Sequence, residues 1–231
     1  MAAPTRGPWL SFALVGFAAA CGSVAPAHDP RADVDALLAA APGDWLERLA
    51  PVHRWGKAAV PCLLEALPAR SESPGAPAAV ALLGRLRDDA AAPWLVGEVA
   101  ARSILATEAA LALGELRAPG PRAELLACVL DPTADATLRT AAAIACVRLG
   151  GGGDVAAFLE AVLLAGSPAG VEPGRTLGLP QRTRWALERY MVQRLLLQEG
   201  AAELAQALDP DASWPALEQV TQGVVAWLRA R

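Results

Sequence analysis

Asp135-Ala-Thr-Leu-Arg-Thr-Ala-Ala-Ala-Ile-Ala-Cys-Val-Arg-Leu-Gly150 is the stretch that decides the fold, because its pattern occurs three times in the chain. Its second half, 142–149, aligns with two earlier segments, 79–86 and 109–116, which end 63 and 33 positions before it. A repeat every 20–50 residues or so is typical of architectures in which each unit buries its apolar face against its neighbours. The sequence therefore predicts a stack of repeated units.

Each copy is preceded by a second, shorter apolar segment. These segments are 61–67, 93–99 and 122–128. Apolar residues recur three and four positions apart instead of alternating, and Ala and Leu dominate. Pro and Gly punctuate the connections. Each unit is therefore predicted to be two helices joined by a short turn. The predicted fold class is all-α, a right-handed α-α superhelix of helical hairpins whose groove is lined by the second helices.

The repeated residues resemble the HEAT-repeat family, especially the short bacterial HEAT-like repeats related to phycobilisome lyases. The matching pattern is an acid, an arginine four residues later, and then Ala-Ala-x-Ala-Leu-Gly-x-Leu. The third copy carries both Asp135 and Arg139, which the first two copies lack. It has Val147 where the first two copies have Gly84 and Gly114.

The resemblance covers roughly residues 56–166, about half of the chain. It implies an α-solenoid (HEAT-like solenoid) with a binding role. It implies no lyase activity, because no residue here matches a chromophore site.

The amino-terminal segment predicts export. Residues 9–20 are apolar and uncharged, follow a short stretch with one arginine, and are too short to span a bilayer, so 1–20 read as a signal peptide. The sequence Ala18-Ala19-Ala20-Cys21 resembles the lipobox of bacterial lipoproteins, which predicts a lipid on Cys21. Ordinary signal cleavage at the same bond is the alternative. With 21–31 as a tether, the chain is expected at the cell envelope, on the periplasmic side or at the outer membrane.

The rest of the chain, 32–231, is predicted to be one HEAT-like domain. Its parts are an amino-terminal cap (32–55) with short helices at 33–41 and 44–52, the repeats (56–166), a long loop (167–180) and carboxyl-terminal helices (181–231). Each cap helix is expected to start at an aspartate. The last helix is predicted at 213–231, with Leu217, Val220, Val224 and Leu228 as its apolar stripe. Loops as long as 167–180 are either functional or tolerated insertions.

Composition argues against several kinds of chemistry. The net charge of −4 and the lack of a basic stripe argue against nucleic acid. The only histidines, His28 and His53, lie in the tether and beside a proline-rich turn, so neither a metal site nor a catalytic triad is predicted. Cys128 and Cys146 would be staggered by about 9 Å in one hairpin, which predicts that they do not form a disulfide. No cofactor is expected.

Candidate binding residues fall into two groups. One group belongs to the repeats: Arg85, Glu115 and Arg148, at one equivalent position, together with Arg139 of the repeat motif. The other is a basic and aromatic patch on the helix expected from 181 to 200, where an anion-binding role is weighed against an ordinary charged helix face. Its members are Arg182, Arg184, Arg189 and Arg194 with Trp185 and Tyr190, joined by Arg175 of the loop.

The predicted function is a non-catalytic scaffold that binds a protein partner at the envelope and is held to the membrane by a lipid on Cys21. The first alternative is a small-molecule or lipid binder with a pocket near the loop at 166–180. An enzyme ranks third.

Overall fold

A computed structural model describes residues 29–118, 120–164, 179–208 and 214–231, and within these ranges every regular element is helical. The predicted all-α fold is confirmed. The helices are α1 (Pro30–Ala39), α2 (Trp45–Arg54), α3 (Val60–Ala66), α4 (Ala76–Leu86), α5 (Ala92–Ala100), α6 (Ala106–Leu116), α7 (Arg122–Leu130), α8 (Ala136–Arg148), α9 (Gly152–Leu164), α10 (Leu179–Gln198), α11 (Ala202–Ala207) and α12 (Trp214–Arg229). Short 3-10 turns, η1 (Pro42–Asp44), η2 (Gly56–Ala59) and η3 (Asp89–Ala91), precede α2, α3 and α5. The predicted signal peptide, most of the tether and most of the long loop lie outside the described residues.

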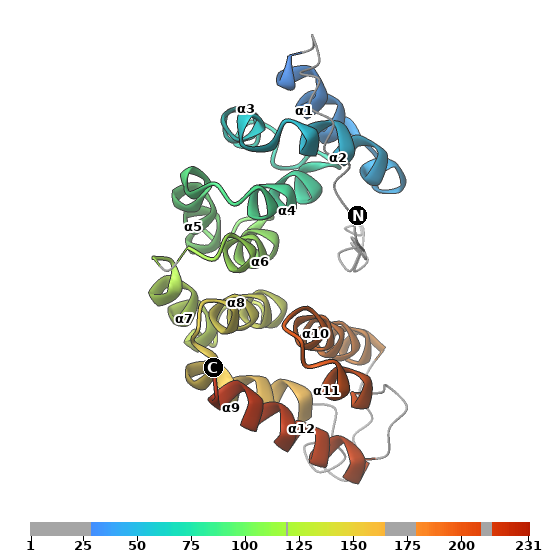
Figure 1. Cartoon of the computed structure of the whole chain (residues 1–231), viewed down its shortest axis with the longest axis vertical. Helices are drawn as coiled ribbons and strands as arrows, with labels where there is room; N and C mark the ends of the chain where they lie inside the picture. The colour runs from blue at the N-terminus through green and yellow to red at the C-terminus, as the bar shows by residue number, and fades with distance from the viewer. Residues whose placement is uncertain (1–28, 119, 165–178, 209–213) are drawn as a thin grey trace, which may run out of the picture.

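The three copies of the repeat form a layered stack. Helices α5 and α6 pack as a pair, α7 and α8 form the next pair, and the second helices α4, α6 and α8 pack on one another in that order. Figure 1 shows these helices side by side through the middle of the molecule, with the first helices α5 and α7 on the outer side. One continuous apolar core runs from α1 to α12.

Two glycines allow the second helices to approach closely. A Cβ atom on Gly84 would lie 2.7 Å from the Cα atom of Ala112, and one on Gly114 would lie 2.8 Å from the Cα atom of Ala145. A glycine of α4 therefore meets an alanine of α6, and the same contact recurs between α6 and α8. Val147 takes the equivalent position in α8, where it is buried. Among the described helices, no further second helix of the repeat follows α8, so the close contact between glycine and alanine does not recur at this position.

The second helices also end alike. Arg87 and Arg117 follow α4 and α6 with φ angles of 49° and 58°, and Gly150 takes the equivalent place after α8 with a φ of 76°. This left-handed backbone terminates a helix and favours glycine. Two of the three copies therefore carry arginine in a conformation that suits glycine better.

The amino-terminal helices differ from the prediction in where they begin. Helix α1 starts at Pro30, and the side chain of Asp29 accepts a hydrogen bond of 2.9 Å from the backbone N–H of Arg31. The predicted start at Asp33 is therefore wrong, because proline suits the first helical position and Asp29 supplies the cap. Asp44 precedes α2, but its side chain makes no capping hydrogen bond.

Asp33 has a different role within this cap. It accepts a hydrogen bond of 2.8 Å from the indole Nε1–H of Trp55, which fixes the end of α2 to α1.

The carboxyl-terminal helices close the stack. Helix α12 packs along α9, and α10 lies against α8 and α9, next to the face formed by the second helices (Figure 1). Leu217, Val224 and Leu228 are buried and Val220 is half-buried, which confirms the apolar stripe predicted for the last helix. The short helix α11 between α10 and α12 was not predicted from the sequence.

Candidate functional site

Equivalent positions of the three second helices, α4, α6 and α8, line one groove. In an α-helix, residues four positions apart share a face, and here that face of each second helix points into the groove. The lining side chains are Pro77, Ala81 and Arg85 from α4, Thr107, Leu111 and Glu115 from α6, and Ile144 and Arg148 from α8. The groove has a volume of about 190 Å³.

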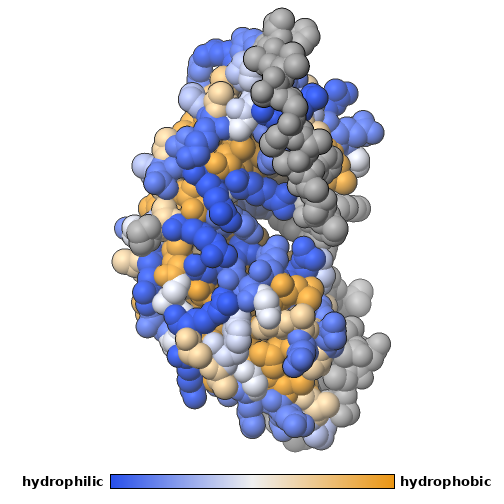
Figure 2. All heavy atoms as spheres, in the orientation of Figure 1, coloured by the Kyte–Doolittle hydropathy of each residue, from blue (hydrophilic) through white to orange (hydrophobic). Residues whose placement is uncertain are grey.

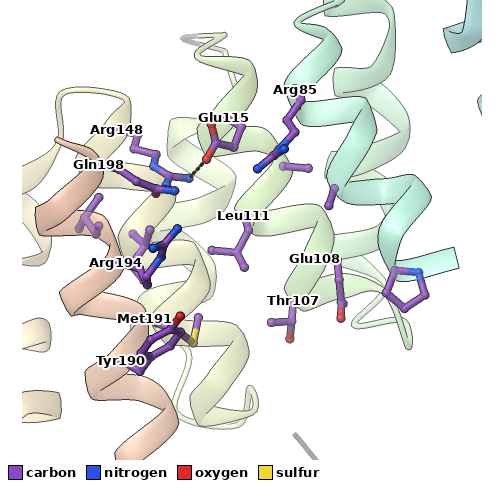
Figure 3. A pocket seen from close by; sticks show the side chains of 15 residues that line it. Arg85, Thr107, Glu108, Leu111, Glu115, Arg148, Tyr190, Met191, Arg194 and Gln198 are labelled. Carbon is purple, nitrogen blue, oxygen red and sulfur yellow. Dashed lines mark hydrogen bonds and ion pairs between the residues drawn. The ribbon is translucent and has the colours of Figure 1, made fainter. Parts of the chain in front are cut away.

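Helix α10 forms the opposite wall of the groove. Tyr190, Met191, Arg194, Leu195 and Gln198 line it from this helix. Figure 3 shows Arg194 and Tyr190 of α10 on the side of the groove that faces Leu111 and Thr107 of α6. In the space-filling view the molecule is hollowed between its α4 and α10 parts, and hydrophilic residues border the hollow (Figure 2). The groove thus has an apolar floor and polar walls.

One end of the groove is built around Arg148. Its side chain is only 7% exposed, and its Nη1 atom lies 2.9 Å from Oε1 of Glu115. Its guanidinium also donates a hydrogen bond to the side chain of Gln198. Burial lowers the pKa of Arg148, while the carboxylates of Glu115 and Glu199 oppose that shift. Ion pairing therefore compensates for the burial of this charge and connects α6, α8 and α10.

Glu199, just after α10, joins several parts of the chain. Its carboxylate, whose side chain is 9% exposed, lies 2.9 Å from Nη2 of Arg117 and 2.7 Å from Nη1 of Arg231. The Nε atom of Arg148 is 3.9 Å away. The guanidinium of Arg231 also stacks 4.4 Å above the ring of Trp227. Glu199 therefore holds the ends of α6, α8 and α12 to the end of α10.

The other end of the groove holds Glu108, in the first turn of α6. Its side chain is buried, and its Oε2 atom has no hydrogen-bond partner within the described part of the chain. Burial raises the pKa of Glu108, and a hydrogen bond with its own backbone partly offsets this shift. Figure 3 places Glu108 beside Thr107, across the groove from Tyr190.

The structure brings three of the predicted binding residues together. Arg85, Glu115 and Arg148 all line the groove, as their shared position in the repeat suggested. Their binding role stays a prediction.

Arg139 has a different location. Its Nε–H donates a hydrogen bond of 2.9 Å to the carbonyl oxygen of Val129, and its guanidinium lies 4.9 Å from the ring centre of Phe158. These contacts join α8, which carries Arg139, to the end of α7 and to α9, and Arg139 does not line the groove. Asp135 caps α8 as predicted, accepting a 2.8 Å hydrogen bond from the backbone N–H of Thr137.

The remaining predicted site residues lie outside the described part of the molecule. These are Cys21 and Arg175, together with the side chains of Arg182 and Arg184.

Sequence reasoning missed Glu108 and did not place α10 at the groove. Glu108 carried a usable signal, because the other two copies have alanine, Ala78 and Ala141, at this position. Tyr190 and Arg194 were predicted to belong to a basic and aromatic patch, but their place in this groove could not be predicted, since α10 lies outside the repeat and its orientation depends on tertiary packing.

Among the described residues, the cysteine side chains do not line this groove. Cys62, Cys128 and Cys146 are free thiols, and burial raises the pKa of Cys146 to about 11. Within the described ranges, no cluster of three or more His, Cys, Asp or Glu side chains is arranged to hold a metal ion. No helix in these same ranges combines the length and hydrophobicity required to span a membrane.

Comparisons of the chain with protein-family models, with curated proteins and with solved structures give no match.

Proposed function

We propose that the chain is a non-catalytic scaffold, a HEAT-like solenoid that binds a segment of a protein partner in the groove between α4, α6, α8 and α10. One observation carries this proposal: equivalent positions of three successive second helices line a single groove. Stacked helical hairpins provide such surfaces for extended ligands. The apolar floor, formed by side chains such as Leu111 and Ile144, suits apolar side chains, and the polar rim suits a peptide backbone.

The proposal places the scaffold at the bacterial cell envelope. The apolar segment at 9–20 and the lipobox-like Ala18–Cys21 stretch support export and lipidation. A lipid on Cys21, followed by a tether, would hold the groove close to a membrane.

A small-molecule or lipid binder is the second candidate. The observation that favours it is the position of α10, the first helix after the predicted long loop, which forms one wall of the groove. A cavity of about 190 Å³ is small for a drug-sized ligand but adequate for a compact one.

Photo-cross-linking in intact cells tests the scaffold. A photoreactive amino acid replaces Leu111, which lines the groove, or Glu124, which is exposed on α7 outside it. The proposal predicts one dominant protein adduct from position 111 that is absent from position 124. A Cys21→Ser variant should lose the adduct together with its membrane association. Identical adducts from both positions, or none from position 111, would refute the scaffold.

A further inference from the structure

Glu108 is an acid at a position where the repeat places alanine. The equivalent residues, Ala78 and Ala141, are buried against the stack, and Glu108 is buried there too, with a relative exposure of 7%. Burial of a carboxyl group costs free energy unless a partner satisfies it. An acid in place of a small apolar side chain therefore calls for a reason beyond the packing of the repeat.

Helix capping explains only part of the arrangement. Glu108 is the third residue of α6, where a glutamate is favoured by the helix dipole and can bond the free N–H groups of the first turn. Its carboxyl group makes a hydrogen bond to its own backbone. The second oxygen, Oε2, remains buried with no partner among the described residues. That atom can accept a hydrogen bond, and Glu108 is one of the residues that line the groove.

The middle of the groove presents a positive charge, in contrast to the acid at its end. Arg194 projects from α10 toward Leu111, and in the described part of the chain it forms no hydrogen bond or ion pair. Arg85 lines the same groove. Glu115 is already engaged by Arg148, so it does not neutralise Arg194. The groove therefore offers a cation at its centre and an unsatisfied acceptor at one end, with apolar side chains between them.

We propose that the groove binds a segment of the partner polypeptide that presents an ammonium group to Glu108 and a carboxylate to Arg194. This inference rests on the proposed scaffold function and specifies what its groove recognises.

The two ends suit these two groups for different reasons. An ammonium group has three donors, so it can satisfy Oε2 of Glu108 and still donate to the hydroxyl group of Thr107, which lies beside Glu108 in Figure 3. Guanidinium binds a carboxylate through two parallel hydrogen bonds, which makes Arg194 a suitable partner for an acidic group. The apolar side chain of Leu111 accommodates the methylene groups between the two charges. A ligand with only one of the charges leaves one end of the groove unsatisfied.

A titration with small probes tests this recognition directly. The full chain in detergent is titrated with ω-amino acids of two to eight carbons, and with the alkanoate and the alkylamine of each length. Binding is followed by the chemical shifts of backbone amides. We expect at least one ω-amino acid to bind about ten-fold more tightly than both of its singly charged counterparts.

Variants assign each charge to its residue. Glu108→Gln is expected to reduce affinity for the ω-amino acid to that of the alkanoate and leave alkanoate binding unchanged. Arg194→Gln is expected to reduce it to that of the alkylamine. Glu124→Gln and Arg229→Gln, which change exposed side chains outside the groove lining, serve as matched controls and should bind as the parent does. Equal affinity for all three probe types, or no effect of either groove variant, would overturn the inference.

The cross-linking experiment separates this inference from the function beneath it. If the adduct from position 111 forms equally well with Glu108→Gln and Arg194→Gln, the scaffold stands and the charge recognition is wrong. If no adduct forms at position 111 in the parent chain, the scaffold itself fails.

Discussion

The two walls of the groove are made in different ways. The wall formed by α4, α6 and α8 comes from one repeated pattern, so its lining residues share positions four apart and can be aligned in the sequence. The wall formed by α10 has no counterpart in the repeat, yet it supplies Tyr190, Arg194 and Gln198. The repeated helices therefore set the shape of the groove, and α10 adds polar side chains that have no equivalent in the repeat. At Glu108 the regular wall departs from its own pattern, since a charged side chain replaces the alanine of the other two copies.

The largest expected effect is a loss of stability when the close contact between two repeated helices, α6 and α8, is disrupted. Gly114→Val introduces into α6 the residue that α8 carries as Val147, but its Cβ would lie 2.8 Å from the Cα atom of Ala145. The helices must then separate, and we expect the free energy of unfolding to fall by about 3 kcal/mol in urea denaturation. Gly97→Ala is the control, because a Cβ there meets nothing within 4 Å, and it should leave stability unchanged or increase it. A small loss in the free energy of unfolding for Gly114→Val would show that close approach of the helices is not required.

The next effect concerns the joint between the two walls. Glu199→Gln removes the carboxylate that pairs with Arg117, Arg231 and Arg148. Three guanidinium groups then face one another without a counter-charge, and we expect a loss of about 2 kcal/mol in the free energy of unfolding. Glu203→Gln, an exposed change in α11, is the control and should cost almost nothing. Increased protease sensitivity of α10 should accompany the loss, and equal stability of the two variants would contradict the role of Glu199.

A smaller effect tests the departure from the repeat at Glu108. Burial raises the pKa of Glu108 above its ordinary value of 4.5, so the folded chain binds this proton more tightly than the unfolded chain does. Its stabilising contribution is therefore complete below pH 4.5 and is lost as pH rises through the folded-state pKa. Glu108→Gln should lack this loss and become more stable than the parent at neutral pH, by on the order of 1 kcal/mol.

Urea denaturation between pH 4 and pH 8 measures this difference. The groove's other ionisable groups, which are Arg85, Glu115, Arg148, Tyr190 and Arg194, are unchanged in the variant. The exposed change Glu124→Gln should follow the parent at every pH. If Glu108→Gln did so as well, Glu108 would have a satisfied carboxylate, and the argument for its ligand would lose its basis.

The smallest effect compares helix ends within the repeat. Arg87 has a φ of 49°, a conformation that its counterpart Gly150 adopts without strain. Arg87→Gly should raise the free energy of unfolding by about 0.5 kcal/mol, since relief of strain slightly exceeds the added entropy of the unfolded chain. Arg117→Gly relieves the same strain but loses the ion pair with Glu199, so it should give no gain. Thermal unfolding of the two variants measures the difference, and a loss of stability in Arg87→Gly would contradict it.

The sequence was informative where the chain repeats itself. Because Arg85, Glu115 and Arg148 occupy one position of the pattern, their convergence on one groove could be predicted from their spacing. Contacts between repeats were harder to predict. Arg139 belongs to the same motif, yet its hydrogen bond to Val129 and its stacking on Phe158 fix neighbouring helices, and these partners are identified only by packing.

The irregular part of the fold carried less information. The helix α11 has only six residues, too few to show a clear apolar period, and the start of α1 depended on a capping hydrogen bond to Asp29 instead of the later aspartate. The orientation of α10 also could not be predicted, because no repeated neighbour defines its register. Tyr190 and Arg194 could be assigned to a basic and aromatic patch from the sequence, but their position in the groove required the placement of that helix.

The carboxylate of Glu199 has a thermodynamic consequence for whatever occupies the groove. Arg148 both lines the groove and contacts Glu199, which also holds Arg117 and Arg231. A ligand that strengthens the contact between Arg148 and Glu199 must, by reciprocity, be bound more tightly when α10 is docked on α8. A ligand that draws Arg148 away favours the undocked helix, and undocking of α10 strengthens the binding of that ligand by the same factor. Occupancy of the groove and the position of α10 are therefore coupled through one side chain.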